Sequence, residues 1–333
     1  MIRVALVGAG RISRVHARSL RLLPDVAPAG VFDPDPGQAQ RLADELGVAA
    51  FPTLEALWAA PQVDAVALCS PLWVHHEQVL GAARAGKHIF CEKPIALTLP
   101  EADEMLAAAK EAGVVFMVGH VVRYMAEYAR IQALAAQGLL GEIRTIYAAR
   151  LSGISAGSWQ GWMLQPGKGL AALDAHIHDL DYIQWLMGPT QQVQASGWQF
   201  PSGTWAHATS WLRCDNGRVA VAEGSFGVPL GFPFTMTLRV IGSEGAASFS
   251  FEGQDYATPY RKTLALYRQG REPETLDTTP IDPYREEMRE FLDCIREGRQ
   301  PERGNPADAR SALALTLAVQ RSLETGSAVE IAP

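Results

Sequence analysis

The chain has 333 residues, of which 48% are hydrophobic and 20% charged, so it carries enough apolar side chains for a folded core and is not a disordered chain. Its length predicts two domains, because a single core rarely grows beyond about 250–300 residues. Twenty-nine Lys and Arg against 36 Asp and Glu leave a net charge of −7, which gives no general field to attract nucleic acid or an anionic membrane. We expect neither as a partner.

The four cysteines lie far apart and form no Cys-x-x-Cys pair. This spacing predicts no metal site and fits reduced thiols in a cytoplasmic protein. The apolar stretch before Gly8 is too short for a signal peptide, and no run of 18 apolar residues occurs. We therefore expect a soluble, cytoplasmic protein.

Alternating strand and helix patterns predict a parallel sheet in the first part of the chain. Apolar runs that predict strands occupy 2–7, the segment ending at 33, 63–69, 88–91 and 114–118. Helical spacing of apolar residues follows them at 12–20, 36–46, 74–85 and 100–112. Strands that are apolar on both faces and are separated by helices are typical of a parallel sheet with helices on each side.

After about residue 122 the pattern changes to short alternating runs. These predicted strands occupy 142–151, 205–213, 218–226, 235–241, 246–252 and 262–268. Helical patterns occupy 128–137, 173–187, 283–297 and 307–324. The sequence therefore predicts an α/β chain with one domain over 1–121 and an α+β domain with a mostly antiparallel sheet over 122–333.

The pattern Gly8-x-Gly10-x-x-Ser13 directly follows the first strand and opens a helix. The first glycine permits a tight turn, and the second lets the backbone approach a pyrophosphate at the helix N-terminus, where amide donors and the helix dipole favour negative charge. Ser13 replaces the usual third Gly or Ala but is also small. The alternative is an ordinary glycine turn.

Asp33 ends the second predicted strand, 25 residues after Gly8. A carboxylate here can accept hydrogen bonds from the adenosine ribose and repel a 2′-phosphate, which predicts NAD in preference to NADP. The alternative is a carboxylate that caps the following helix.

Two further segments follow buried strands at the edge of the sheet where ligands bind in open parallel sheets. One begins Cys69-Ser70-Pro71, and the other is Glu92-Lys93-Pro94. A lysine beyond a buried strand and fixed by a proline is expected to point into the crevice. The alternative is a surface lysine in a loop.

Asp174 and His178 are four residues apart in a predicted helix and therefore share one face, whereas His176 points away from His178. This spacing disfavours a His-x-His metal pair. A carboxylate and an imidazole on one face suit a proton-transfer group, and the alternative is a structural Asp beside a buried His.

Together the glycine loop, Glu92-Lys93-Pro94 and the segment 174–181 resemble the family of glucose-fructose oxidoreductase, inositol dehydrogenase and the rhizopine catabolism proteins (Gfo/Idh/MocA). The resemblance covers essentially the whole chain, and the segment 85–94 is its most specific part. It implies an N-terminal Rossmann NAD-binding domain and a C-terminal α+β substrate and oligomerisation domain with a large open sheet.

The resemblance also implies roles for individual residues. The substrate hydroxyl would be handled by Lys93, His178 and Asp174. The residues implied in cofactor binding are Gly8, Gly10, Arg11, Ile12, Asp33, Ser70, Pro71, His75, Glu92 and Lys93.

Several positions depart from the family pattern and leave the particular substrate open. Leu72 stands where Asn is common, Met163 where Arg is frequent, and Lys168 interrupts a common glycine triplet. His176 occupies a place often held by Gly, and we expect it to bring an imidazole towards the crevice.

The resulting hypothesis is an NAD(H)-dependent oxidoreductase that transfers hydride between nicotinamide and a secondary hydroxyl or carbonyl of a sugar, polyol or cyclitol. The alternatives are an NAD-dependent glycosidase of the same fold and a non-enzymatic dinucleotide-binding regulator. The resemblance further implies a homodimer or homotetramer formed through the open sheet.

Overall fold

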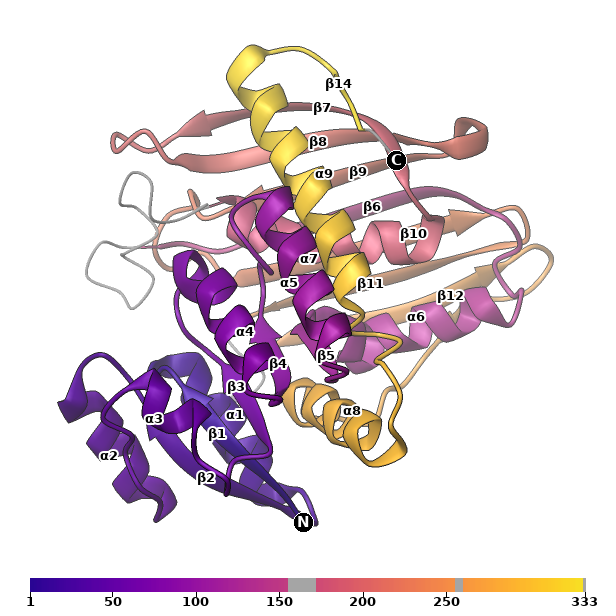
Figure 1. Cartoon of the computed structure of the whole chain (residues 1–333). Helices are drawn as coiled ribbons and strands as arrows, with labels where there is room; N and C mark the ends of the chain where they lie inside the picture. The colour runs from indigo at the N-terminus through magenta and orange to yellow at the C-terminus, as the bar shows by residue number, and fades with distance from the viewer. Residues whose placement is uncertain (155–171, 255–259, 332–333) are drawn as a thin grey trace. The chain divides into compact units, whose positions relative to one another are not determined.

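The computed structural model describes residues 1–154, 172–254 and 260–331, which form two compact units (Figure 1). The first unit contains Met1–Tyr124 and Ile281–Leu313, and the second contains Met125–Pro280 and Ala314–Pro333. The sequence had assigned all residues from 122 onward to one domain. The structure differs in that the segment 281–313 makes its contacts with the first unit.

The first unit is built on a parallel sheet with the strand order β2-β1-β3-β4-β5. The strands are β1 (Ile2–Val7), β2 (Val26–Phe32), β3 (Ala65–Leu68), β4 (His88–Glu92) and β5 (Phe116–Gly119). The chain passes from β1 to β2 on one side and then to β3 on the other. The predicted Rossmann-type sheet is confirmed, and the order of its strands reverses between β1 and β3.

Helices join successive strands of this sheet, and one further helix comes from the segment 281–313. Side-chain caps begin several of them, whereas the helices that start at Arg11 and His75 have none. The helices are α1 (Arg11–Leu22), α2 (Pro36–Leu46), α3 (Leu54–Trp58), α4 (His75–Arg84), α5 (Leu99–Glu111) and α8 (Pro283–Glu297), with short 3₁₀ turns at Leu72–Val74 and Val121–Tyr124. Thr98 and Glu101 form a capping box at the start of α5. Helices α1 and α8 pack against each other, and Leu6, Phe90 and Phe291 belong to one buried core.

The segment 281–313 also supplies hydrogen-bond partners to backbone groups at the β5 edge of the parallel sheet. The side chain of Gln300 accepts a hydrogen bond from the amide of Phe116 at 3.3 Å and donates to the carbonyl of Val114 at 3.1 Å. The amide of Val118 donates to the carbonyl of Gly304 at 3.0 Å. An uncovered β5 would present unpaired amides, so these contacts close an otherwise open sheet edge.

The second unit holds a sheet of nine strands among its described residues, in the order β13-β12-β11-β10-β6-β9-β8-β7-β14. Every neighbouring pair is antiparallel except β6 and β9, which are parallel. The strands are β6 (Ile143–Leu151), β7 (Thr190–Gln199), β8 (Trp205–Cys214), β9 (Val219–Ser225), β10 (Phe234–Gly242), β11 (Gly245–Gly253), β12 (Arg261–Arg268), β13 (Glu274–Thr275) and β14 (Val329–Glu330).

Helices cover one face of this sheet. The unit contains α6 (Ala126–Ala136) and α7 (Ala172–Met187), while α9 (Pro306–Thr325) has residues in both units. Helix α7 packs on β6, β8 and β9 (Figure 1). Along β8, Ser210 and Leu212 are buried whereas Trp211 is 55% exposed, as expected for a strand with one covered face. The predicted large, open and mostly antiparallel sheet is therefore confirmed.

Among the described residues, no helix combines the length and apolar character needed to span a bilayer.

Candidate active site

The glycine loop lies where the strand order of the first unit reverses. Gly8 follows β1 with a φ of +96°, and a Cβ placed there would lie 2.8 Å from the backbone oxygen of Cys69. Gly10 is the N-cap of α1, makes no side-chain cap, and a Cβ built on it meets no atom within 4 Å. The loop therefore presents backbone amides and a helix N-terminus to open space, which fits a pyrophosphate.

Asp33 is tied to this loop. Its Oδ2 accepts a hydrogen bond from the amide of Ala9 at 2.8 Å, and its Oδ1 accepts one from the amide of Asp35 at 2.9 Å. Capping of α2 is performed by Asp35, which accepts hydrogen bonds from Gly37 and Gln38. The Asp33 carboxylate thus stands beside the glycine loop and is not used as the helix cap.

His75 joins the loops that follow β3 and β4. It is buried, with Nδ1 2.9 Å from the carbonyl oxygen of Pro94 and Nε2 3.0 Å from that of Ser70. Burial lowers its pKa, against the effect of the two carbonyls. The Ser70 hydroxyl donates to Gln78 at 2.5 Å, and Leu72 is buried beside the loop. The predicted contribution of these residues to cofactor binding remains a prediction.

Glu92 and Lys93 lie at the end of β4. Glu92 Oε1 forms a 2.8 Å hydrogen bond with His16 Nε2, and its Oε2 accepts from the amide of Lys93 at 3.2 Å. Burial alone would raise the pKa of Glu92, but the hydrogen bond and charge of His16, together with the charge of Lys93, outweigh it and lower the pKa. The half-buried Lys93 is therefore held through its own backbone.

Glu287 on α8 belongs to the same region and was not singled out from the sequence. It is fully buried, and burial together with the charge of Glu92 raises its pKa well above the usual value. The sequence does contain a signal, because Glu287 interrupts the stripe of apolar and aromatic side chains formed by Tyr284, Met288 and Phe291 at helical spacing.

In the second unit, Asp174 and His178 are partly exposed on α7, and His176 between them is fully buried. His176 Nε2 lies 2.8 Å from the hydroxyl of Ser210 on β8, and burial lowers the pKa of His176 to about 3. The expectation that this imidazole points towards the crevice is wrong. A residue two positions from His178 lies on the opposite side of the helix, here the side packed on the sheet.

A buried ion pair fixes α7 on the sheet. Arg150 of β6 donates to both carboxylate oxygens of Asp179, at 3.2 and 3.0 Å, and its guanidinium also reaches the hydroxyl of Tyr128. Burial raises the pKa of Asp179, and the charge and hydrogen bonds of Arg150 oppose that rise. The bidentate geometry restrains the helix turn that carries His178.

Two sequence departures, Met163 and Lys168, lie outside the described residues.

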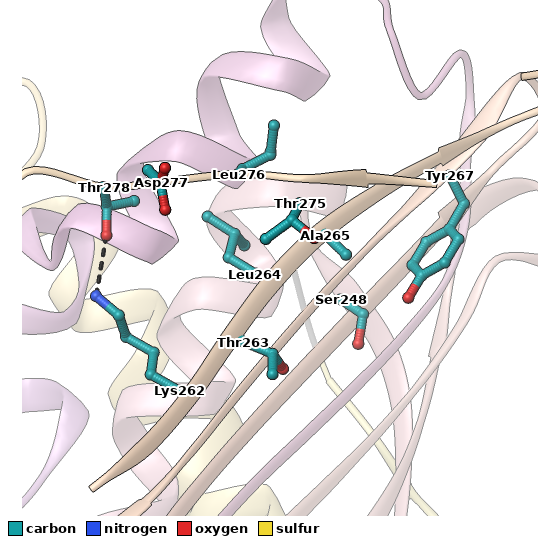
Figure 2. Close-up of a pocket in the computed structure, with 10 residues that line it drawn as sticks. All are labelled: Ser248, Lys262, Thr263, Leu264, Ala265, Tyr267, Thr275, Leu276, Asp277 and Thr278. Atoms are coloured by element: carbon teal, nitrogen blue, oxygen red, sulfur yellow. Dashed lines mark hydrogen bonds between the residues drawn. The ribbon is translucent and has the colours of Figure 1, made fainter. Parts of the chain in front are cut away.

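A cavity of about 370 Å³ lies in the second unit at the strands β12 and β13, and none of its lining residues is a predicted site residue (Figure 2). Lys262 Nζ already donates to Glu127 at 2.7 Å and to Thr278 at 3.1 Å, the latter drawn in Figure 2. Its charge is thus balanced within the protein. The residues that line the cavity are Ser248, Lys262, Thr263, Leu264, Ala265, Tyr267, Thr275, Leu276, Asp277 and Thr278.

The parallel sheet with its glycine loop at the strand reversal defines a dinucleotide-binding Rossmann protein. Residues 2–120 match the family model described as "Oxidoreductase family, NAD-binding Rossmann fold", and residues 128–248 match the GFO/IDH/MocA C-terminal domain. The chain belongs to the Gfo/Idh/MocA family of NAD-binding oxidoreductases.

Relatives with named activities span part or all of the chain. A crystallised UDP-N-acetylglucosamine 3-dehydrogenase from Acidithiobacillus ferrooxidans is 30% identical, covers 97% of this chain and 98% of that one, and has a TM-score of 0.82. Myo-inositol 2-dehydrogenase of Thermotoga maritima is 26% identical over 99% of this chain and 98% of that protein. The 2,7-anhydro-N-acetylneuraminate hydratase of Escherichia coli is 35% identical over 56% of this chain, and the match spans about half of that relative, 50% of its length.

Proposed function

We propose that this protein is an NAD(H)-dependent dehydrogenase or reductase for a secondary hydroxyl or carbonyl of a sugar, polyol or cyclitol. The observation that carries the proposal is the open glycine loop at the N-terminus of α1, where a Cβ on Gly10 would occupy the space a pyrophosphate needs. The names of the full-length relatives, an inositol dehydrogenase and a nucleotide-sugar dehydrogenase, support the substrate class.

The preferred cofactor in this proposal is NAD. Asp33 already accepts the Ala9 amide through one carboxylate oxygen, which keeps its negative charge beside the loop that would hold the pyrophosphate. That charge favours ribose hydroxyls as hydrogen-bond donors and opposes a 2′-phosphate. The other proposed cofactor contacts are those named from the sequence, including Arg11, Ile12, Pro71 and Glu92.

In this proposal, three side chains stabilise charge or transfer a proton at the substrate hydroxyl. Bound nicotinamide would accept or supply the hydride. The Lys93 ammonium stabilises negative charge that develops on the substrate oxygen. His178 takes the hydroxyl proton during oxidation and returns it during reduction, and the Asp174 carboxylate, one helical turn away, stabilises the imidazolium.

A second candidate has a specific observation in its favour. The relative with 35% identity is named a hydratase of an anhydro sugar, not a dehydrogenase. An enzyme of this second kind would act on glycosidic or anhydro linkages by oxidising its sugar transiently and returning the hydride, so that no net NADH would accumulate.

The deciding experiment combines NAD or NADP with a panel of sugars, polyols, cyclitols and anhydro sugars. Nicotinamide absorbance reports net oxidation, and mass spectrometry of the sugar reports conversion without net NADH. Turnover with net NADH would support the first proposal, and conversion without it would support the second. No change in either signal across the panel would reject both and favour a non-enzymatic dinucleotide-binding regulator.

We also propose a cytoplasmic homodimer or homotetramer that associates through the open face of the second unit's sheet. The exposed Trp211 and Ile241 on that face support the assignment, because large apolar side chains on a flat sheet favour self-association. The residues up to 121 would bind NAD and the later strands would bind substrate.

A further inference from the structure

Three buried titratable side chains lie together inside the first unit. They are His16 on α1, Glu92 at the end of β4 and Glu287 on α8, and one nitrogen or oxygen atom from each lies within 4.8 Å of the others. Their exposed fractions are 0%, 9% and 0%. Because the three residues come from elements far apart in the sequence, the cluster forms only when the fold is complete.

The two carboxylates of the cluster are bound very differently. Both oxygens of Glu92 are engaged, one by His16 and one by the amide of Lys93. Neither oxygen of Glu287 has a hydrogen-bond partner among the described residues. A buried carboxylate without partners is strongly disfavoured in its charged form, and a second carboxylate close by disfavours it further.

The charges around Glu287 also favour its protonated, neutral form. The strongest of them are the carboxylates of Glu92 and Asp282, both negative. His16 and Lys93 act on Glu92 and keep it ionised. Cys69, Cys91 and Tyr124 are further titratable groups of the region, and burial raises the pKa of each well above its ordinary value, so all three are uncharged at neutral pH. Tyr284 packs edge-on against the His16 ring.

We propose that Glu287 is a neutral carboxylic acid at neutral pH and acts as a positioning residue for Lys93. As a neutral group it fills the space beside Glu92 without repelling it, so that the ionised Glu92 stays between His16 and the backbone of Lys93. The inference rests on the proposed function, because that function gives Lys93 its role beside the substrate.

Protonation of Glu287 can be observed directly. A protonated carboxylic acid has an infrared carbonyl band that an ionised carboxylate lacks. At about pH 7, far above the ordinary Glu pKa of about 4.3, we expect this band in wild type and its loss in Glu287→Gln. Glu297→Gln is the matched control, since Glu297 ends the same helix with an exposed side chain and should leave the band unchanged.

The positioning role is tested with wild type, Glu287→Gln and one further variant, Glu287→Ala. Glu287→Gln imitates the neutral acid and should keep the NADH dissociation constant within about twofold of wild type, whereas Glu287→Ala should raise it by about fivefold or more. Amide hydrogen exchange should become faster in the peptide that contains Lys93 in Glu287→Ala, while peptides of α2 in the same unit keep their wild-type rates.

Four results would overturn the inference. They are the absence of the infrared band in wild type, loss of NADH binding in Glu287→Gln, unchanged NADH affinity and exchange at Lys93 in Glu287→Ala, and a stoichiometric divalent metal in wild type that Glu287→Gln lacks. If Glu287→Ala does not fold, the infrared band of wild type and the NADH affinity of Glu287→Gln still test the inference. Failure of wild type to bind NADH would instead reject the proposed function. The infrared and exchange results would then still test whether Glu287 is protonated and whether it restrains Lys93.

Discussion

Two histidines on α7, two residues apart, should respond to mutation in opposite ways. If His178 transfers the substrate proton, His178→Ala should lower turnover by about 10²–10⁴-fold and leave NAD affinity and melting temperature nearly unchanged. His176→Ala should instead lower the free energy of unfolding by about 1–3 kcal/mol, because it removes a buried ring and leaves the Ser210 hydroxyl without its partner.

Turnover, NAD affinity and thermal stability measured on both variants decide between these roles. Near-normal turnover in His178→Ala would reject the assignment of His178 as the base. A large loss of turnover per folded molecule in His176→Ala would show that the buried imidazole has a catalytic part that its packing on the sheet does not suggest.

Asp33 makes a separate prediction about the cofactor. Wild type should bind NAD at least about tenfold more tightly than NADP, because a 2′-phosphate would meet a like charge. Asp33→Asn should narrow this ratio while the amide oxygen still accepts the Ala9 hydrogen bond. Isothermal titration with both dinucleotides measures the ratio, and equal or tighter binding of NADP by wild type would contradict the assignment of Asp33.

The stability of the protein should also depend on pH through Glu287. The folded pKa of this carboxyl is raised, so between the unfolded value of about 4.3 and that raised pKa the folded state holds one proton more than the unfolded state. The free energy of unfolding therefore falls as the pH rises through this window. Relative to Glu287→Gln, each pH unit should change the wild-type unfolding equilibrium constant by about tenfold, as measured by urea denaturation at several pH values. Parallel pH profiles for the two proteins would contradict this prediction.

At the scale of elements, the two glycines of the loop after β1 should be separable by mutation. Gly8→Ala places a side chain at a φ of +96° and 2.8 Å from the Cys69 carbonyl oxygen, so it should destabilise the fold by about 1–3 kcal/mol. Gly10→Ala has an allowed φ of −75° and open space around its Cβ, so stability should change by no more than about 0.5 kcal/mol.

Binding is the second measurement on this pair. Fluorescence titration of NADH should show at least about a tenfold weaker affinity in Gly10→Ala, because its methyl group occupies the space that we assign to the pyrophosphate. Unchanged affinity would place the dinucleotide elsewhere.

Local patterns predicted most elements of both units. The apolar runs that became β1, β3 and β4 are short and bounded by polar or glycine residues. Helix α8 has the bounds 283–297 that its apolar spacing predicts, and the structure shows Asp282 and Gly298 as its caps. Strand β7 was not predicted separately, because the buried Val193 and Ala195 stand among polar residues and give a weak alternation.

Long-range relations could not be predicted from local patterns. The parallel pairing of β6 with β9 and the hydrogen bonds of Gln300 to β5 join segments that nothing in the local sequence connects. In the candidate site, the periodicity of α7 correctly separated His176 from His178, and the family resemblance misled us about the direction of His176. The position of Glu287 in an apolar stripe was a signal whose partner, Glu92, only the fold reveals.

At the scale of the whole molecule, we predict that the open face of the second unit's sheet forms the homo-oligomer interface. The strand register places Trp211, Val221, Tyr147 and Arg239 in one row across that face. Trp211→Glu should weaken self-association by about thirtyfold or more, because loss of a central aromatic residue typically costs about 2 kcal/mol or more. Light scattering at micromolar concentration measures this, and a monomeric wild type would refute the proposed oligomer.

The return of residues 281–313 to the first unit has a consequence for synthesis on the ribosome. The 156 residues of 125–280 must be translated between the two parts of that unit, which takes roughly 8 to 30 s at about 5–20 residues per second. Throughout that interval the nascent chain has neither Gln300 to cover β5 nor α8 to pack on α1. Residues 1–124 must therefore remain incomplete, with an open sheet edge, until 281–313 has been translated. We expect the nascent chain to need a chaperone most during this interval.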